Sequence, residues 1–276
     1  MRIGIGLPNA LPGVDRDLLL EWARRADAGP FSSLAVLDRL VYDSIEPFAA
    51  LSAAAAITER IRLATMIAIG PLRNTALLAK QVASVSALAG GPERLTLGLA
   101  VGARKDDYDA AGVEYARRGA ELSEQLAYLR SGRGDQVCAP CESVELLVGG
   151  ASGPAFARMA RYADGYAHGG GPPRAFASAA TKARAAWRDL GRRGAPVLWG
   201  QAYVTLTDAE GGADYLRDYY AFTGGFAEKI AAGNLTTARA VKDLIRGYEA
   251  EGCDELVLLP TVADLADIDR LAEVVA

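Results

Sequence analysis

One stretch of the chain combines residue types that can bind an anion: Val144-Glu-Leu-Leu-Val-Gly-Gly-Ala-Ser-Gly-Pro-Ala155. Its apolar run, Val144 to Val148, predicts a buried strand. Gly149-Gly150 follows at once, and then a helical pattern begins in which Ser152 suits the N-cap and Pro154 suits the first turn. Glycines let backbone N–H groups approach a ligand closely, and the helix dipole favours negative charge there. We interpret this stretch as a cradle for the phosphate of a bound cofactor.

A plainer interpretation stays open for the same stretch. Glycine and serine are common in the strand-to-helix turns of α/β proteins. The pattern also differs from the GxGxxG motif of dinucleotide-binding folds, so it does not predict that class of site.

A polar pair, Asp38-Arg39, follows a second short apolar run at Ser33–Leu37. Arg39 could hold negative charge on a reduced cofactor, with Asp38 holding its guanidinium in place. Alternatively, the two side chains form a structural ion pair that ties the loop to the strand.

The chain has a single histidine, His168, at the end of a predicted strand and before Gly169-Gly-Gly171. It could act as a general acid or base, or donate a hydrogen bond to a cofactor. A purely structural role is the alternative.

Two other clusters predict no chemistry. Cys138-Ala-Pro-Cys141 could hold zinc only with two further ligands, and Cys253 and His168 are the sole candidates, so we expect no metal. Asp106, Asp107 and Asp109 near Arg117-Arg118 are expected to form a solvated charge cluster.

The elements that must position these residues alternate along the chain. Each strand-like run is followed by a helical pattern, which predicts a parallel sheet. The chain of 276 residues has room for a closed (β/α)8 TIM barrel, and an open Rossmann-like sheet is the alternative. We expect one domain over residues 1–276, with a short irregular insertion around 130–143. The predicted strands are Ile3–Leu7, Leu34–Leu37, Arg62–Ile69, Leu95–Val101, Val144–Val148, Gly165–His168, Val197–Thr205 and Glu255–Leu259.

Composition narrows the class of protein. The net charge is −4, with no basic stripe, so the sequence does not predict nucleic-acid binding. No apolar run is long enough to predict a membrane span, and with only three cysteines we expect a cytoplasmic, reduced protein.

In a barrel, chemistry occurs where strands end, and these positions are rich in glycine and lack a Ser–His–Asp arrangement. Such a site suits a large flat cofactor that carries the reaction.

Taken together, these segments resemble the bacterial luciferase-like superfamily of flavin- and deazaflavin-dependent oxidoreductases, over nearly the whole chain. The resemblance depends on the order and spacing of short pieces. They include Ile3-Gly-Ile-Gly-Leu-Pro8, Leu37-Asp-Arg-Leu40, Thr58–Thr65, Pro71-Leu-Arg-Asn-Thr75, Leu78–Val82, Gly90–Gly98, Val148–Pro154 and Ala160–Gly165.

The resemblance implies a barrel, usually dimeric, with the flavin ring at the carboxyl ends of the strands. It places the cofactor phosphate at Gly149, Gly150, Ala151, Ser152 and Gly153. It also implies a non-proline cis peptide behind the ring, between Met66 and Ile67. Many members have histidine where this chain has Arg39, which puts base catalysis from that position in doubt.

The function implied is a monooxygenase that uses reduced FMN and dioxygen on a small organic substrate, with a separate flavin reductase as partner. The alternatives are a dehydrogenase or reductase that uses the deazaflavin coenzyme F420, and a non-catalytic flavin-binding protein. A homodimer is expected through Glu46–Ile57 and Thr75–Leu88, whose small residues permit close helix packing.

Overall fold

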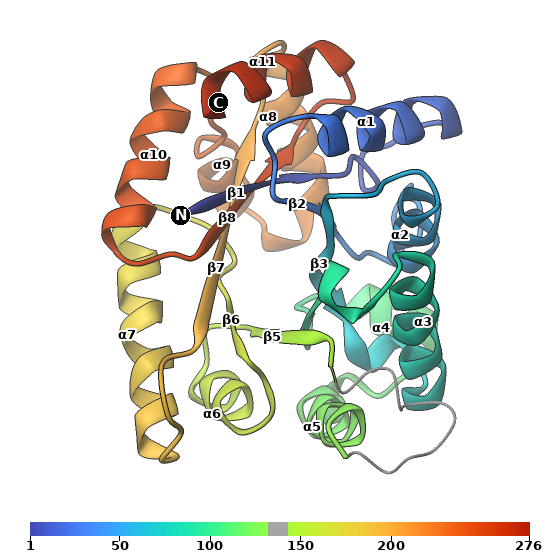
Figure 1. The fold of residues 1–276 in the computed structure, drawn as a ribbon, viewed down its shortest axis with the longest axis vertical. Helices are drawn as coiled ribbons and strands as arrows, with labels where there is room; N and C mark the ends of the chain where they lie inside the picture. The colour runs from blue at the N-terminus through green and yellow to red at the C-terminus, as the bar shows by residue number, and fades with distance from the viewer. Residues whose placement is uncertain (132–142) are drawn as a thin grey trace.

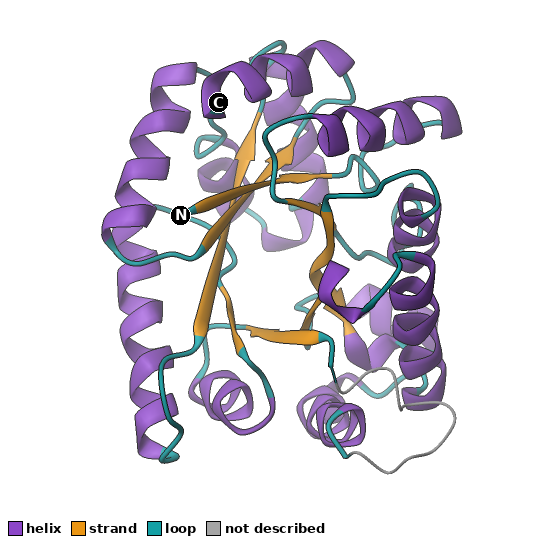
Figure 2. Cartoon of the chain, viewed as in Figure 1, coloured by secondary structure: helices purple, strands orange, loops and turns teal. Residues whose placement is uncertain are grey.

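The structure is a computed structural model that describes residues 1–131 and 143–276. Its centre is a closed barrel of parallel strands in the order β1 to β8, wrapped by helices (Figures 1 and 2). The predicted (β/α)8 fold is therefore confirmed, and the open sheet is excluded. Most of the expected insertion around 130–143 lies outside the described residues.

Each strand pairs with the next along the chain, and β8 closes the ring on β1 through the register Arg2↔Glu255 to Ile5↔Leu258. Because all strands are parallel, their carboxyl ends meet at one mouth of the barrel. The strands are β1 (Arg2–Gly6), β2 (Ser33–Val36), β3 (Arg62–Ile69), β4 (Leu95–Ala100), β5 (Glu145–Gly149), β6 (Gly165–Ala167), β7 (Val197–Val204) and β8 (Glu255–Pro260).

The outer layer consists of helices that follow the strands. The longer ones are α1 (Arg16–Ala28), α2 (Pro47–Ala55), α3 (Thr75–Leu88), α5 (Arg118–Leu129), α6 (Gly153–Tyr162), α7 (Pro173–Asp189), α8 (Ala209–Tyr219), α10 (Ala238–Ala250) and α11 (Leu265–Val275). A helix follows each strand along the chain, as the alternating pattern predicts. The pattern missed two short helices at the mouth, α4 (Lys105–Ala111) and α9 (Phe226–Ala231).

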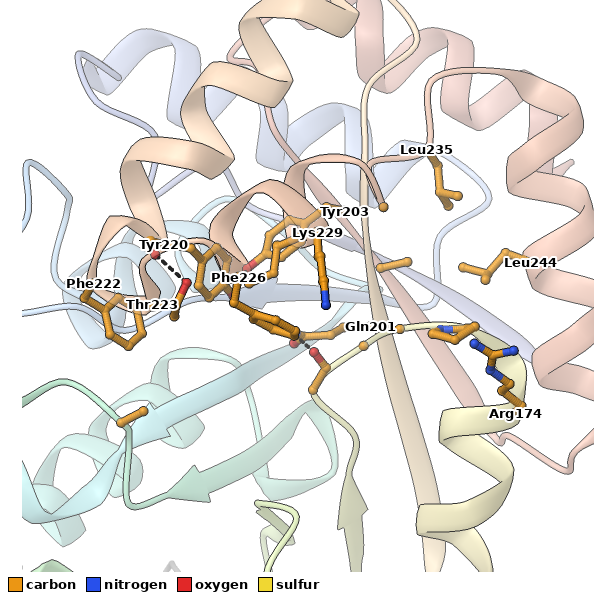
Figure 3. Close-up of a pocket in the computed structure, with 18 residues that line it drawn as sticks. Arg174, Gln201, Tyr203, Tyr220, Phe222, Thr223, Phe226, Lys229, Leu235 and Leu244 are labelled. Carbon is orange, nitrogen blue, oxygen red and sulfur yellow. Dashed lines mark hydrogen bonds between the residues drawn. The ribbon is translucent and has the colours of Figure 1, made fainter.

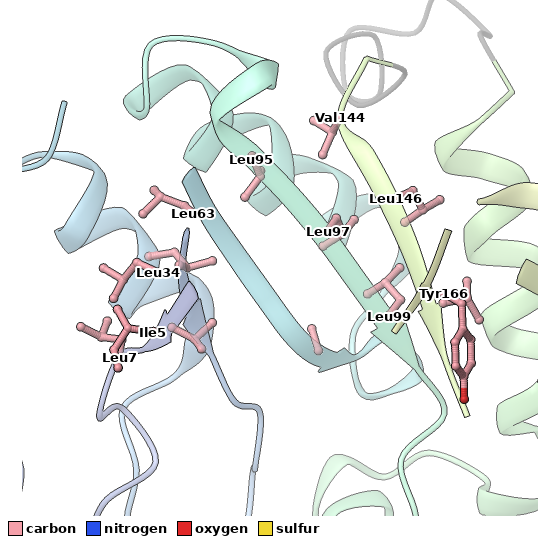
Figure 4. Packing of buried hydrophobic residues seen from close by; sticks show 14 of the residues in the cluster. Ile5, Leu7, Leu34, Leu63, Leu95, Leu97, Leu99, Val144, Leu146 and Tyr166 are labelled. Atoms are coloured by element: carbon pink, nitrogen blue, oxygen red, sulfur yellow. The ribbon is translucent and has the colours of Figure 1, made fainter. Parts of the chain in front are cut away.

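The core has two parts because side chains alternate across a strand. Outward-pointing residues such as Leu34, Leu63 and Leu97 pack under the helices (Figure 4). Inward-pointing residues such as Ala64, Trp199 and Val257 fill the barrel. This alternation decides which strand residues can reach the mouth and which face the helices.

Helix starts are fixed locally by capping side chains. The Asp15 carboxylate accepts from the Leu18 N–H at 2.9 Å, and Ser152 caps α6 as the sequence predicts. At the start of α3, Asn74 accepts from the N–H groups of Ala76 and Leu77. The entry of the chain into α6, next to the candidate site, is therefore defined by the residues at that turn.

Candidate functional site at the barrel mouth

The glycine turn after β5 has the features of an anion cradle. Gly150 has a φ of 120°, which favours glycine, and its carbonyl accepts a hydrogen bond from the Tyr166 hydroxyl at 3.0 Å. Within the described chain, the backbone N–H groups of Ala151 and Ser152 have no acceptor. Both residues are exposed at the start of α6, so these donors are free to bind an anion.

The strands next to this turn present small side chains. An added Cβ at Gly149 would lie 3.4 Å from the Ala100 Cβ and 3.6 Å from Cγ2 of Ile67. At Gly98 an added Cβ would lie 3.1 Å from the same Ile67 atom. The Met66–Ile67 peptide bond is cis, as the resemblance implies. Since little protrudes here except Ile67, this part of the mouth fits a flat ring system.

Asp38 does not pair with Arg39, so that expectation is wrong. Its carboxylate binds Arg73 at two points, 2.6 Å to Nη1 and 3.1 Å to Nη2, and it also accepts from the Ile69 N–H at 2.8 Å. The two neighbouring side chains have partners from different parts of the chain, Arg73 for Asp38 and Asp107 for Arg39. Asp38 therefore ties the ends of β2 and β3 together.

Arg39 lies in a different buried pair. Its Nε is 3.4 Å from the Asp107 carboxylate, and the Asp107 side chain is 0% exposed. The guanidinium also lies over the rings of Tyr42 and Tyr219, at 4.8 and 4.9 Å from their centroids. The expectation that Asp107 belongs to a solvated charge cluster is therefore wrong, because Asp107 is the acceptor that compensates a buried cation.

His168 faces away from the barrel interior. Tyr166 belongs to the outer core and Ala167 to the inner one, so alternation puts His168 on the outer side. Its ring centroid is 5.6 Å from that of Phe176 on α7 and 6.5 Å from that of Tyr248 on α10. Burial lowers the pKa of His168, and its Nε2 has no partner among the described residues. His168 therefore packs among aromatic side chains outside the barrel interior, and the proposals below give it no acid or base role.

A cavity of about 940 Å³ opens beside β6 and β7 at the same end of the barrel (Figure 3). Its walls come from the loop after β6, the inward face of β7 and the segment between β7 and β8 that contains α8 and α9. The lining side chains include Gln201, Tyr203, Tyr220, Phe222, Phe226, Lys229, Leu235, Leu244 and Arg174. The described lining has no carboxylate and no imidazole.

Two tyrosines meet at the wall of this cavity. The hydroxyl oxygens of Tyr203 and Tyr220 are 2.7 Å apart, and their rings are packed edge to face. Burial raises the pKa of both hydroxyls above the ordinary value. Both therefore stay protonated, so that one hydroxyl can donate to the other and the pair retains a proton to donate to a ligand.

Sequence reasoning missed most of this cavity. The alternation of β7 was a usable signal, because Trp199 points inward and the same period places Gln201 and Tyr203 inward. Phe226 and Lys229 carry no motif, and only the path of the chain between β7 and β8 brings them to the mouth.

The described residues offer neither a metal site nor a membrane-spanning helix. They contain no group of three or more His, Cys, Asp and Glu side chains that could hold a metal ion. No helix in the described ranges is long and apolar enough to cross a membrane. The Cys138 and Cys141 pair lies outside those ranges.

The fold is a TIM barrel, with a candidate site at the carboxyl ends of the strands. The family model of the luciferase-like monooxygenases matches residues 1–266, and the chain belongs to this family of oxidoreductases.

Part of the chain is similar in sequence to mycobacterial proteins. An uncharacterised protein of Mycobacterium tuberculosis is 32% identical over 189 residues, which cover 55% of this chain and 65% of that protein. This chain thus spans slightly less than two thirds of that relative's length.

Solved structures agree in fold. An F420-dependent secondary alcohol dehydrogenase in complex with an F420–acetone adduct has a TM-score of 0.80 at 17% identity, covering 99% of this chain and 97% of that one. The oxygenating constituent of 3,6-diketocamphane monooxygenase from Pseudomonas putida, in complex with FMN, has a TM-score of 0.73 at 16% identity. It covers 100% of this chain and 96% of that one.

Proposed function

We propose that this protein is a monooxygenase that uses reduced FMN and dioxygen to oxidise a small organic substrate bound in the cavity. The observation that carries the proposal is the chemistry of the cavity wall. Oxidising an alcohol by hydride transfer requires a group that accepts the hydroxyl proton. The described lining offers no carboxylate or imidazole for that task, and its tyrosines are protonated.

The cofactor would be held by residues that fit it. The free N–H groups of Ala151 and Ser152, with the turn at Gly149–Gly153, would bind the phosphate. The small residues around Ile67 would receive the flat ring. When bound, reduced FMN supplies the electrons for activating dioxygen, and a separate flavin reductase would regenerate it.

Residues of the cavity wall would bind and orient the substrate. Phe222 and Phe226 add apolar surface to the cavity wall, which would displace water from a substrate packed against them. The Tyr203–Tyr220 pair can donate a hydrogen bond to an oxygen of the substrate. Gln201, whose amide donates to the Gly169 carbonyl at 3.3 Å, fixes the loop that forms the floor.

Titration with oxidised FMN, reduced FMN and coenzyme F420 tests the proposal, followed by oxygen uptake with a panel of small ketones, aldehydes and alcohols. We expect tight binding of reduced FMN and substrate-dependent oxygen uptake that yields an oxygenated product. Oxidation of alcohols with F420 and without dioxygen would contradict the proposal and favour the dehydrogenase. Binding of FMN without turnover of any compound would favour the non-catalytic alternative.

A further inference from the structure

Two cations flank the apolar cavity from opposite sides. Lys229 on α9 points its ammonium group toward Gln201, and the Arg174 guanidinium approaches from the start of α7 (Figure 3). In the described part of the chain, neither has a carboxylate within ion-pair distance, whereas many other arginines are paired. The positive charge on the cavity wall is therefore uncompensated.

The rest of the wall is apolar or neutral. Phe222 and Phe226 are 44% and 56% exposed, although both are large hydrophobic side chains. Ile230, Leu235 and Leu244 continue this surface. Exposed aromatic groups beside unpaired cations suit a ligand that has an apolar body and an anionic group.

The loop Gly169–Pro172 also favours an anionic group in the ligand. Gly170 and Gly171 have φ values of 96° and 113°, and the loop leads directly into α7. It brings backbone close to the cavity without side chains, at the positive end of a helix dipole. Arg174 lies in that first turn, so its charge and the dipole act on one region.

We propose that the substrate is an amphipathic organic anion, an apolar molecule bearing a carboxylate or sulfonate, whose charged group is attracted by the positive charges of Lys229 and Arg174 on the cavity wall. This inference rests on the proposal that the cavity takes the substrate. The cofactor phosphate is assigned to the separate turn at Gly149–Gly153, so these two cations are available for the substrate.

Two fluorescent probes that share an aromatic skeleton test the charge preference without any cofactor. Anilinonaphthalene sulfonate carries an anionic group, and N-phenylnaphthylamine lacks it. Lys229→Met and Arg174→Met should each weaken sulfonate binding about threefold, and the double variant about tenfold, as expected for partly exposed ion pairs. Binding of the neutral probe should not change.

Matched controls use exposed cations away from the cavity, Lys242→Met on α10 and Arg188→Met at the far end of α7. Neither substitution should change the affinity for either probe. Phe226→Ala should weaken both probes alike, because it removes apolar surface of the cavity.

Three results would overturn the inference. Equal effects of the charge variants on both probes would remove the charge preference. Unchanged binding in Phe226→Ala would show that the cavity does not take the anion. Weaker FMN binding in Lys229→Met or Arg174→Met, with the sulfonate unaffected, would assign the cations to the cofactor. Probe binding requires neither FMN nor turnover. A result that overturns the charge preference is therefore distinct from one that overturns the proposed oxygen-dependent activity.

Discussion

The guanidinium of Arg39 and the carboxylate of Asp107 form a buried pair, with Nε and Oδ2 3.4 Å apart and side-chain exposures of 3% and 0%. Asp107 also accepts hydrogen bonds from the N–H groups of Leu40 and Val41. Arg39 in turn donates to the Tyr219 carbonyl at the end of α8. The pair thus joins the loop after β2, helix α4 and the segment that walls the cavity.

This geometry predicts a stability effect at Arg39. Arg39→Ala would leave the Asp107 carboxylate buried with weaker compensation, since Arg104 approaches it only to 3.8 Å. We expect the free energy of unfolding to fall by about 3 kcal/mol, measured by urea denaturation. Asp106→Ala is the matched control, because its side chain is 42% exposed and its pair with Arg104 should contribute under about 1 kcal/mol.

The same variant separates structure from redox chemistry. If Arg39 only holds the fold, Arg39→Ala should change the affinities for oxidised and reduced FMN by equal factors. A selective loss of reduced-FMN binding would instead assign Arg39 the charge-stabilising role that the sequence suggested.

The phosphate cradle is best tested at Gly153. An added side chain there meets nothing within 4 Å, whereas one at Gly150 would have a φ of 120° and lie 2.9 Å from the Ala155 Cβ. Gly153→Asp puts a carboxylate at the start of α6, which suits the helix dipole but repels a phosphate. FMN affinity should fall about 100-fold, which corresponds to about 2.7 kcal/mol of binding free energy. The melting temperature should stay unchanged or rise slightly.

Gly153→Ala serves as the control and should bind FMN nearly as wild type does. If the aspartate variant also keeps wild-type affinity by fluorescence titration, the phosphate binds elsewhere.

His168 should make stability depend on pH. Burial lowers the pKa of His168 below its ordinary value of about 6.5. Below that pH the unfolded chain binds a proton that the folded protein resists, so this contribution to stability is present above about pH 6.5 and is lost as the pH falls. As the pH is lowered from neutral to mildly acidic, the melting temperature of His168→Gln should fall less than that of the wild type. Parallel curves for the two proteins would contradict the lowered pKa.

The expected homodimer can be tested on α3. Leu77 is 53% exposed on α3, one of the two helices through which the dimer is expected. Leu77→Glu should convert a dimer to a monomer in light scattering, because it buries a charge in the interface. Leu190→Glu, which has the same exposure beyond the end of α7, should leave the mass unchanged. A monomeric wild-type protein at micromolar concentration would remove the prediction.

Much of the architecture could be predicted from the sequence, for local physical reasons. Apolar runs such as Val144–Val148 must be buried, and capping residues such as Ser152 start helices within one turn. The glycine turn could be identified because its conformation and free N–H groups depend on residues adjacent in the chain. The cis bond at Met66–Ile67 came from the family resemblance alone.

The pairing of charged side chains and the cavity were decided by tertiary structure. Asp38 is adjacent to Arg39 in sequence, yet it binds Arg73, and Arg39 binds Asp107, because closure of the barrel brings loops from different strands together. Likewise, Lys229 and Arg174 meet at one cavity from segments 55 residues apart in the sequence. Sequence by itself determined the strands, the helices and the glycine turn after β5, since these follow from local periodicity and backbone chemistry. The partner of each charged group depended on long-range packing, which a single sequence does not display.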